Sequence, residues 1–503
     1  MNWLHWIHRF LKVLIITVGV YFILIYCFVS VTHIRFPFAL EWMEGGILDH
    51  VQRILMGQRV YGAPALDFSP FIYSPLYFYI CAGMSFITGF GFETLRFVSF
   101  LASVGSLCMI YLLVRRETSN TFAGATAAFF FAATYRISGP YFDMGRVDSL
   151  FLFFFLAALY LVKICKTKPL MVLAAFLACA SCLTKQSALI LTPVLLLSCL
   201  LFQSRSNTAL FVLTYLFSYA ASTVCIDIAN GGWYWFYVFQ LPGQHPLAIE
   251  RFAYFWTHDI LLALPLGVLC ALIGLCSGQA MKPTKNRFFY MMLAFCMLAF
   301  SCMSRLKVGG FTNVLFPAYA VISILFGFST GSLLQDAHDN QNVKRNLLKA
   351  GIYLLCLVQL GMLLYDPRPL IPREKYRTMC ERVVVSVSRI KGEVFMPAYG
   401  YLGKMAKKNG SIHIAAVDDI LLGQTGLVQQ KLIYDIRKAL SEQKYSAIIL
   451  DRKFTAFNRD IQENYLLLKD FDPDRNFWPL VKYVYVPRLN PFSLSKHEAV
   501  PEE

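Results

Sequence analysis

Two glutamates are the side chains best suited to act as a base. Glu41 and Glu44 open a polar segment just beyond a long apolar run. A carboxylate can accept the proton of a hydroxyl group while that hydroxyl attacks another centre. If the segment is helical, a spacing of three residues puts both carboxylates on one face. The alternative is a pair of solvated acids, with Gly45 and Gly46 forming a turn.

Four basic residues in other segments are suited to binding a phosphate group. They are Arg146, Lys185, Arg305 and Lys307, the last of which is followed closely by two glycines. Arg grips phosphate through two parallel hydrogen bonds, and Lys binds it as a point charge. Plainer alternatives exist for Asp148, Lys185 and the glycines after Lys307, whereas Arg146 is less easily explained. Asp148, beside Arg146, is placed to cap a helix. Lys185 is placed to reach toward the membrane surface, and the two glycines are suited to a simple turn.

An aromatic run at residues 233–239 precedes His245. Aromatic rings gather where a membrane meets water, and they also form platforms for a sugar or a prenyl chain. We favour the interfacial belt and keep His245 as a candidate for substrate binding.

The composition places these residues on a membrane protein. The chain has 503 residues, of which 57% are hydrophobic and 15% charged, whereas soluble domains carry about 25% charged residues. The apolar residues form blocks of roughly 16 to 22 residues, the length of a helix that crosses a bilayer. The first block, residues 10–31, follows basic residues and lacks a cleavage site, so we interpret it as a retained signal anchor.

Charge and cysteine usage exclude two other classes of protein. The net charge of +16 comes mostly from short loops between apolar blocks and from the C-terminal tail, which argues against nucleic-acid binding. The 14 cysteines lie almost entirely within or beside the apolar blocks, including the one CxxC pair, Cys179 and Cys182, so they suggest neither a metal site nor a disulfide framework.

Basic loops give the topology, because short loops rich in Lys and Arg face the cytoplasm. Placing them inside predicts about eleven transmembrane helices, at about 11–32, 94–114, 121–137, 149–165, 170–183, 187–203, 209–226, 258–278, 288–303, 314–334 and 349–366. The apolar block at residues 75–90 would reverse every later loop if it crossed the membrane. We therefore expect it to form a helix at the outer face.

The charged candidates all fall on the outer side of this topology. The predicted external segments are residues 33–93, 138–148, 184–186, 226–257 and 304–313. Between residues 149 and 226 there is no Asp or Glu. Charged side chains near an apolar boundary are costly and therefore suggest function. Acids and bases that converge at one membrane face predict a site for a phosphate-bearing substrate beside a carboxylate.

The composition changes at residue 367 to mixed charge with alternating apolar residues. We predict strands at residues 392–398, 411–417, 445–450 and 482–486, and an amphipathic helix at residues 431–443. The fold class is thus an all-α membrane bundle over residues 1–366, with a small extracytoplasmic α/β domain over residues 367–503.

Four sequence elements, in order, resemble the GT-C superfamily of membrane glycosyltransferases. Within it, the chain looks like bacterial relatives of the dolichyl-phosphate-mannose protein mannosyltransferases and of the lipid A aminoarabinose transferases. The first element is the acidic start of the loop at Glu41 and Glu44, followed by the helix at 48–57, Tyr61 and the stretch at 73–77. The other three are Arg146 to Asp148, Thr184 to Gln186, and Lys307 to Asn313 with Pro317 downstream.

The chain departs from the family at two places. Many members begin the first external loop with Asp-Glu, whereas here two residues separate Glu41 from Glu44, so either could be the base; we prefer Glu44. Tyr73-Ser74 stands where the lipid A transferases have Glu-Lys, so the substrate of that relative is not carried over.

The resemblance implies a single inverting displacement, in which a sugar moves from a polyprenyl-phosphate donor to an acceptor hydroxyl on lipid A, a polysaccharide or a protein. Glu41 or Glu44 would be the base. The substrate-binding residues would be Arg146, Asp148, Lys185, His245, Arg305, Lys307 and Asn313. Asp148 would orient Arg146, or hold a divalent cation such as Mg²⁺ or Mn²⁺ with the loop carboxylates. Metal use stays open.

The implied location is the cell inner membrane, with the active site and the C-terminal domain on the periplasmic face. Three other functions fit part of the pattern. A lipid-linked glycan polymerase or ligase is also a transferase. A transporter or flippase would carry charges at mid-membrane, often with inverted repeats, and a glycolipid-binding scaffold would not need acids on the external face.

Overall fold

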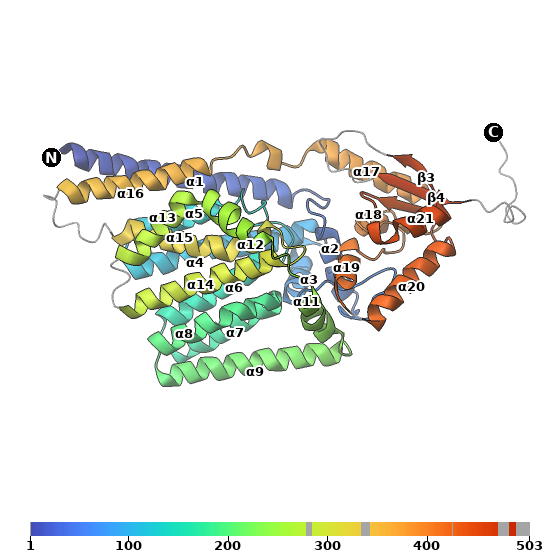
Figure 1. Cartoon of the computed structure of the whole chain (residues 1–503), viewed down its shortest axis with the longest axis horizontal. Helices are drawn as coiled ribbons and strands as arrows, with labels where there is room; N and C mark the ends of the chain where they lie inside the picture. Colours follow the sequence, from blue (N-terminus) through green and yellow to red (C-terminus); the bar gives the residue numbers. More distant parts are fainter. Residues whose placement is uncertain (1, 278–283, 333–342, 425, 471–481, 489–503) are drawn as a thin grey trace, which may run out of the picture.

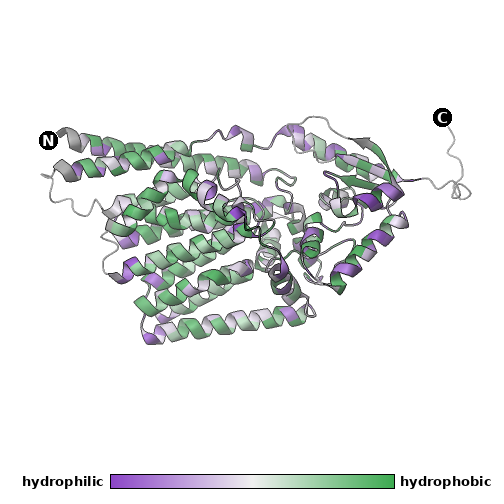
Figure 2. Cartoon of the chain, in the orientation of Figure 1, coloured by the Kyte–Doolittle hydropathy of each residue, from purple (hydrophilic) through white to green (hydrophobic). Residues whose placement is uncertain are grey.

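A bundle of long helices carries a smaller α/β part at one end in the computed structural model (Figure 1). The structure describes residues 2–277, 284–332, 343–424, 426–470 and 482–488. The long helices are α1 (Asn2–Ile34), α4 (Phe92–Thr118), α5 (Thr121–Ala133), α6 (Asp148–Ile164), α7 (Lys168–Thr184), α8 (Thr192–Phe202), α9 (Arg205–Ala229), α13 (Pro265–Ser277), α14 (Thr284–Leu306), α15 (Phe316–Ser332) and α16 (Val343–Met362). Each predicted span coincides with one of them, and Figure 2 shows that they are mostly hydrophobic.

Length and composition identify five described helices as able to cross a membrane, in the ranges Trp6–Ile34, Phe92–Thr118, Arg205–Ala229, Thr284–Leu306 and Thr312–Gly331. A sixth span is formed if Arg251–Leu262 and Pro265–Cys276, bent by 85°, count as one. Most of the remaining predicted spans are apolar helices of 10–17 residues, shorter than the roughly 20 residues that an upright span needs.

The positions of helices α15 and α9 in the bundle differ in how closely their neighbours approach. The whole apolar window of α15 is buried inside the bundle. Its Gly327 lies so close to α5 that an added Cβ atom would stand 2.7 Å from the Cβ of Ala127. Small residues permit this close approach of helices in membranes. In α9, by contrast, only 11% of the apolar window is buried, so this helix lies at the edge of the bundle.

The external segments fold into short elements between the bundle and the C-terminal part. They are α2 (Glu44–Leu55), α3 (Leu76–Thr88), η1 (Gln186–Leu191), α10 (Trp233–Trp235), η2 (Phe236–Gln240), α11 (Leu241–Gln244), α12 (Arg251–Tyr254), η3 (Phe255–Leu262) and η5 (Thr312–Leu315). The expected helix at residues 75–90 is α3, and Figure 1 places it at the end of the bundle nearest the C-terminal part.

The C-terminal part contains a four-stranded sheet with helices around it. Its elements are η6 (Arg368–Leu370), α17 (Glu374–Arg389), β1 (Val394–Phe395), α18 (Gly400–Met405), α19 (Ile414–Leu422), α20 (Leu427–Ser441), β2 (Ala447–Leu450), η7 (Thr455–Phe457), α21 (Asn458–Asn464), β3 (Tyr465–Asp470) and β4 (Tyr483–Pro487). The strand order is β1-β2-β4-β3, with β1 parallel to β2 and the other pairs antiparallel.

Three of the four predicted strands and the amphipathic helix are present, the latter as α20. The predicted strand at residues 411–417 is wrong. His413 accepts the backbone N–H of Ala415 on its Nδ1 atom at 3.1 Å, and this contact caps α19. The cap starts a helix in a segment whose alternation suggested a strand. Strand β3 was not predicted from the sequence.

Two hydrophobic cores stabilise the molecule. One fills the bundle, and the other is shared by the first external segment, α10, α11 and the C-terminal part. Tyr401 of α18 belongs to the second core, and its hydroxyl accepts the N–H of Ala39 at 3.2 Å. Its ring lies so close to Gly45 that a Cβ atom added to this glycine would stand 2.7 Å from it. The division at residue 366 remains a prediction, since the second core extends across it.

Candidate active site

Glu44 begins α2 and is sealed inside the protein. Arg96 of α4 contacts both carboxylate oxygens, at 2.9 and 2.7 Å, and neither side chain is exposed. The N–H groups of Gly145, Leu40 and Glu41 donate to the same carboxylate at 2.8, 2.8 and 3.3 Å. Burial acts to raise the pKa of Glu44, but Arg96 and the backbone donors outweigh it and lower that pKa. With its acceptor sites filled, Glu44 is poorly placed to take a proton, which reverses our preference for it.

Glu41 has fewer partners. Its Oε1 atom contacts Nη1 of Arg146 at 2.9 Å, and its Oε2 atom accepts the N–H of Met43 at 3.0 Å. The side chain is 7% exposed. Burial raises the pKa of Glu41 above the usual value for a glutamate, although Arg146 opposes the rise. A carboxylate can accept about four hydrogen bonds, so Glu41 keeps capacity for a substrate proton.

Arg146 continues into a buried network. Its guanidinium contacts Asp148 at 3.4 Å and donates to the Tyr73 hydroxyl at 3.2 Å. Lys185 Nζ lies 2.6 Å from Asp148 Oδ1, and Asn313 Nδ2 donates to Asp148 Oδ2 at 2.9 Å. Residues from four predicted external segments therefore converge, as the charge pattern suggested. Asp148 lies at their centre, where it contacts Arg146, Lys185 and Asn313.

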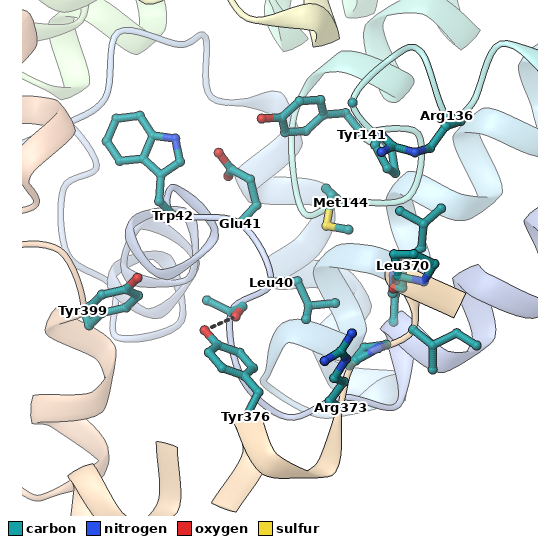
Figure 3. A pocket seen from close by; sticks show the side chains of 17 residues that line it. Leu40, Glu41, Trp42, Arg136, Tyr141, Met144, Leu370, Arg373, Tyr376 and Tyr399 are labelled. Atoms are coloured by element: carbon teal, nitrogen blue, oxygen red, sulfur yellow. Dashed lines mark hydrogen bonds between the residues drawn. The ribbon is translucent and has the colours of Figure 1, made fainter. Parts of the chain in front are cut away.

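A pocket of about 560 Å³ opens beside this network. It is lined by His33, Ala39, Leu40, Glu41, Trp42, Arg136, Gly139, Pro140, Tyr141, Met144, Pro369, Leu370, Ile371, Pro372, Arg373, Tyr376 and Tyr399. Figure 3 shows the Glu41 carboxylate between the rings of Trp42 and Tyr141, with Arg136 and Arg373 on other walls. The volume is typical of pockets that bind small ligands, and its carboxylate and cations are the groups that transfer from a phosphate carrier requires.

Comparison with known proteins supports the resemblance found in the sequence. The family model for dolichyl-phosphate-mannose-protein mannosyltransferase matches residues 72–235. The crystal structure of ArnT from Cupriavidus metallidurans bound to undecaprenyl phosphate is similar over 93% of this chain and 97% of that chain, with a TM-score of 0.61 and 12% identity. The chain has the GT-C fold.

Other comparisons agree with the GT-C fold. The apo form of the same ArnT gives a TM-score of 0.57 at 12% identity, over the same shares of the two chains. The arabinofuranosyltransferase AftD from Mycobacteria gives 0.51 at 13% identity, over 96% of this chain and 40% of that chain. No curated protein matches the chain by sequence. The predicted fold class, a polytopic helical bundle with a small C-terminal α/β part, is confirmed.

Three of the predicted site residues belong neither to the pocket lining nor to the network around Arg146. Arg305 pairs with Asp259 at 2.8 Å and donates to the carbonyl of Gly310 at 2.6 Å. Lys307 donates through Nζ to the carbonyl of Pro242 at 2.7 Å. His245 donates through Nε2 to a backbone carbonyl of α19 at 2.8 Å. These contacts join external loops to one another and to the C-terminal part.

Several pocket residues that were not predicted come from distant parts of the chain. Arg373, Tyr376 and Tyr399 belong to the C-terminal part, whose approach to the pocket no local pattern announces. Arg136 carried a signal, as a cation at the outer end of the predicted span at residues 121–137. So did Arg96, a charged residue inside a predicted span, which is rare unless a partner is present.

The carboxylates of the GT-C site are poorly suited to hold a metal ion. Glu41 and Asp148 are the oxygen ligands expected for Mg²⁺ or Mn²⁺, but Arg146 and Lys185 pair with them. Within the described ranges, no group of three or more His, Cys, Asp and Glu residues is arranged to bind a metal.

Proposed function

We propose that the protein moves a sugar, with inversion, from a polyprenyl-phosphate donor to an acceptor hydroxyl at the periplasmic face of the inner membrane. The observation that carries the proposal is the Glu41 carboxylate, which lies in the wall of the 560 Å³ pocket and is anchored by Arg146. The solved relative that holds undecaprenyl phosphate supports the class of donor. The proposed catalytic domain is residues 1–366, completed by pocket walls from residues 367–503.

Glu41 is the base in this proposal. It accepts the proton of the acceptor hydroxyl while the hydroxyl oxygen bonds to the anomeric carbon, and the bond from that carbon to the phosphate oxygen breaks. The released lipid phosphate keeps the electron pair of that bond. A base that acts during the attack contributes about 10²- to 10⁴-fold to the rate.

The leaving phosphate needs cations rather than an acid. Arg136 and Arg373 line the pocket and offer guanidinium groups for this purpose. Arg146 and Lys185 already contact carboxylates, so we assign them, with Asp148 and the Asn313 amide, to positioning Glu41. Arg305, Lys307 and His245 stay outside the proposed reaction centre.

The test is transfer by the full-length protein in liposomes. The donor is the pool of polyprenyl-phosphate sugars extracted from host cells grown with a labelled sugar, and the acceptor is a membrane extract from a deletion strain. We expect Glu41→Gln to lower the turnover about 10²- to 10⁴-fold with an unchanged melting temperature. Glu381→Gln is the control, because Glu381 is a half-exposed glutamate on α17. Turnover close to wild type in Glu41→Gln would remove Glu41 from the reaction.

A further inference from the structure

Trp42 follows the proposed base in the sequence, and the C-terminal part fixes its position. His413 Nε2 donates to the Trp42 carbonyl at 2.9 Å, while the other ring nitrogen accepts the N–H of Ala415. The His413 and Trp42 rings lie 5.9 Å apart, and the Arg452 guanidinium lies 5.2 Å from the centre of the indole. Burial lowers the pKa of His413 to about 4, so the neutral ring that these contacts need is present at neutral pH.

Tyr399 brings the edge of the C-terminal sheet to the same pocket. Strands β1 and β2 are parallel, so their carboxyl ends meet at one edge, which is where open α/β sheets bind ligands. Tyr399 follows β1, and Asp451 and Arg452 follow β2 directly. Burial, and to a smaller extent Asp451, raises the pKa of Tyr399 above the usual value for a tyrosine.

Asp451 adds an unused polar atom at this edge. Its Oδ1 atom is buried and has no hydrogen-bond partner among the residues that the structure describes. Buried polar atoms are almost always hydrogen-bonded, so an exception calls for an explanation such as a bound water or ligand. Arg452 pairs with Asp418 at 4.0 Å, where both side chains are half-exposed.

We infer that the acceptor is a carbohydrate, whose ring is held by Trp42 and Tyr399 at the carboxyl edge of the C-terminal sheet. This inference rests on the proposed function and names the acceptor class of that same pocket. A sugar ring presents an apolar face that packs on an aromatic ring and a rim of hydroxyls that need polar partners. Trp and Tyr have this dual character, and four aromatic residues, Trp42, Tyr141, Tyr376 and Tyr399, line the pocket around Glu41.

A peptide acceptor fits this pocket less well. Extended peptides bind along a sheet edge or a long groove that pairs with their backbone. The walls here are loops and helix ends, and the segment from Pro369 to Arg373 crosses one side of the pocket. Leu370 fixes that segment, because its carbonyl accepts a hydrogen bond from His33 Nε2 at 2.7 Å. A compact ring with a reacting hydroxyl is the better match.

The first test follows the label from the donor pool described above. After the reaction, the products are separated into solvent-extractable glycolipid, aqueous glycan and protein. We expect the label in the glycolipid or the glycan fraction, and the labelled fraction then identifies which of these molecules carries the acceptor sugar. We also expect protease treatment to leave the labelled product unchanged. Label that becomes soluble only after protease treatment would overturn the carbohydrate acceptor and leave the proposed transfer intact. A donor that is never consumed would instead overturn the proposed transfer.

The second test separates the acceptor from the donor kinetically, with the labelled membrane fraction as the acceptor. Trp42→Ala is expected to raise the apparent KM for the acceptor on the order of tenfold, since an aromatic contact and its buried area are lost. Trp42→Phe keeps a ring and should recover most of the loss. Trp235→Ala, on the exposed side of α10, is the matched control. Equal rises in the KM for donor and acceptor, or an unchanged acceptor KM in Trp42→Ala, would overturn the assignment.

Discussion

Two Glu–Arg pairs lie three residues apart in the first external segment, and their surroundings differ. The Glu44–Arg96 pair is closed. Arg96 uses its remaining N–H groups on the carbonyls of His33, Phe36 and Phe38, at 2.6 to 2.7 Å. The Glu41–Arg146 pair is open, because the Glu41 carboxylate forms part of a pocket wall.

The difference is the ground for proposing Glu41 rather than Glu44 as the base. Burial acts to raise the pKa of both acids, yet the pKa of Glu44 is lowered by its many donors whereas that of Glu41 is raised. A base needs both an unfilled acceptor site and some affinity for a proton. Only Glu41 has both, although the two residues look equivalent in the sequence.

The largest expected effect comes from breaking the closed pair. Arg96→Leu leaves the Glu44 charge buried without its main partner and also frees three carbonyl groups. We expect a loss of about 3–5 kcal/mol in the free energy of unfolding, measured by thermal or denaturant unfolding in detergent. Arg116→Leu, at an exposed position near the end of α4, should change it by less than about 0.5 kcal/mol. Equal stability of the two variants would show that the closed pair does not hold the first external segment.

The next effect comes from the open pair. Arg146→Lys keeps one charge but loses the fork that reaches Glu41, Asp148 and Tyr73 together. We expect turnover to fall roughly ten- to a hundredfold, since hydrogen bonds to charged groups are worth about 1.5–3 kcal/mol, while the melting temperature changes less than in Arg96→Leu. Turnover within twofold of wild type would mean that Arg146 does not position the base.

The sequence was enough to predict which residues from distant segments meet at one end of the bundle. Glu41, Arg146, Asp148, Lys185 and Asn313 were found because acids and bases clustered in predicted external loops, and they do converge. Choosing between the two glutamates was not possible from spacing, because the choice depends on which arginine each one meets.

The C-terminal part was the least predictable region. Local alternation placed β2 and β4 correctly, but the 411–417 segment has the same alternation and becomes helical after the His413 cap. The contribution of Tyr399 to the pocket depends on a core shared with the first external segment, more than 300 positions away in the chain. No single-sequence pattern encodes such a contact.

A pH profile sharpens the comparison further. Glu41 must be unprotonated to act as the base, and burial raises its pKa. The value of kcat/KM should therefore fall as the pH is lowered, about tenfold per unit below that pKa, starting at a higher pH than the usual glutamate pKa of about 4.3. The measurement is the transfer rate between pH 4 and 8. If the fall in kcat/KM at low pH were the same in Glu41→Gln, it would be due to the titration of another group.

The smallest effect on transfer is expected for a substitution of Lys307. Here two cations, Lys307 and Arg136, are compared in the same way as the two glutamates. Lys307 donates to the carbonyl of Pro242, whereas the exposed Arg136 lines the pocket. Lys307→Ala should therefore change the donor KM by less than about twofold, as expected for an exchange worth under about 0.5 kcal/mol. Arg136→Ala should raise the donor KM several times more, since it removes a guanidinium that can contact phosphate. Donor titrations at saturating acceptor measure both. If Lys307→Ala raised the donor KM more than Arg136→Ala, the phosphate would lie at the 307–313 loop, and the open pocket at Glu41 would then receive the acceptor alone.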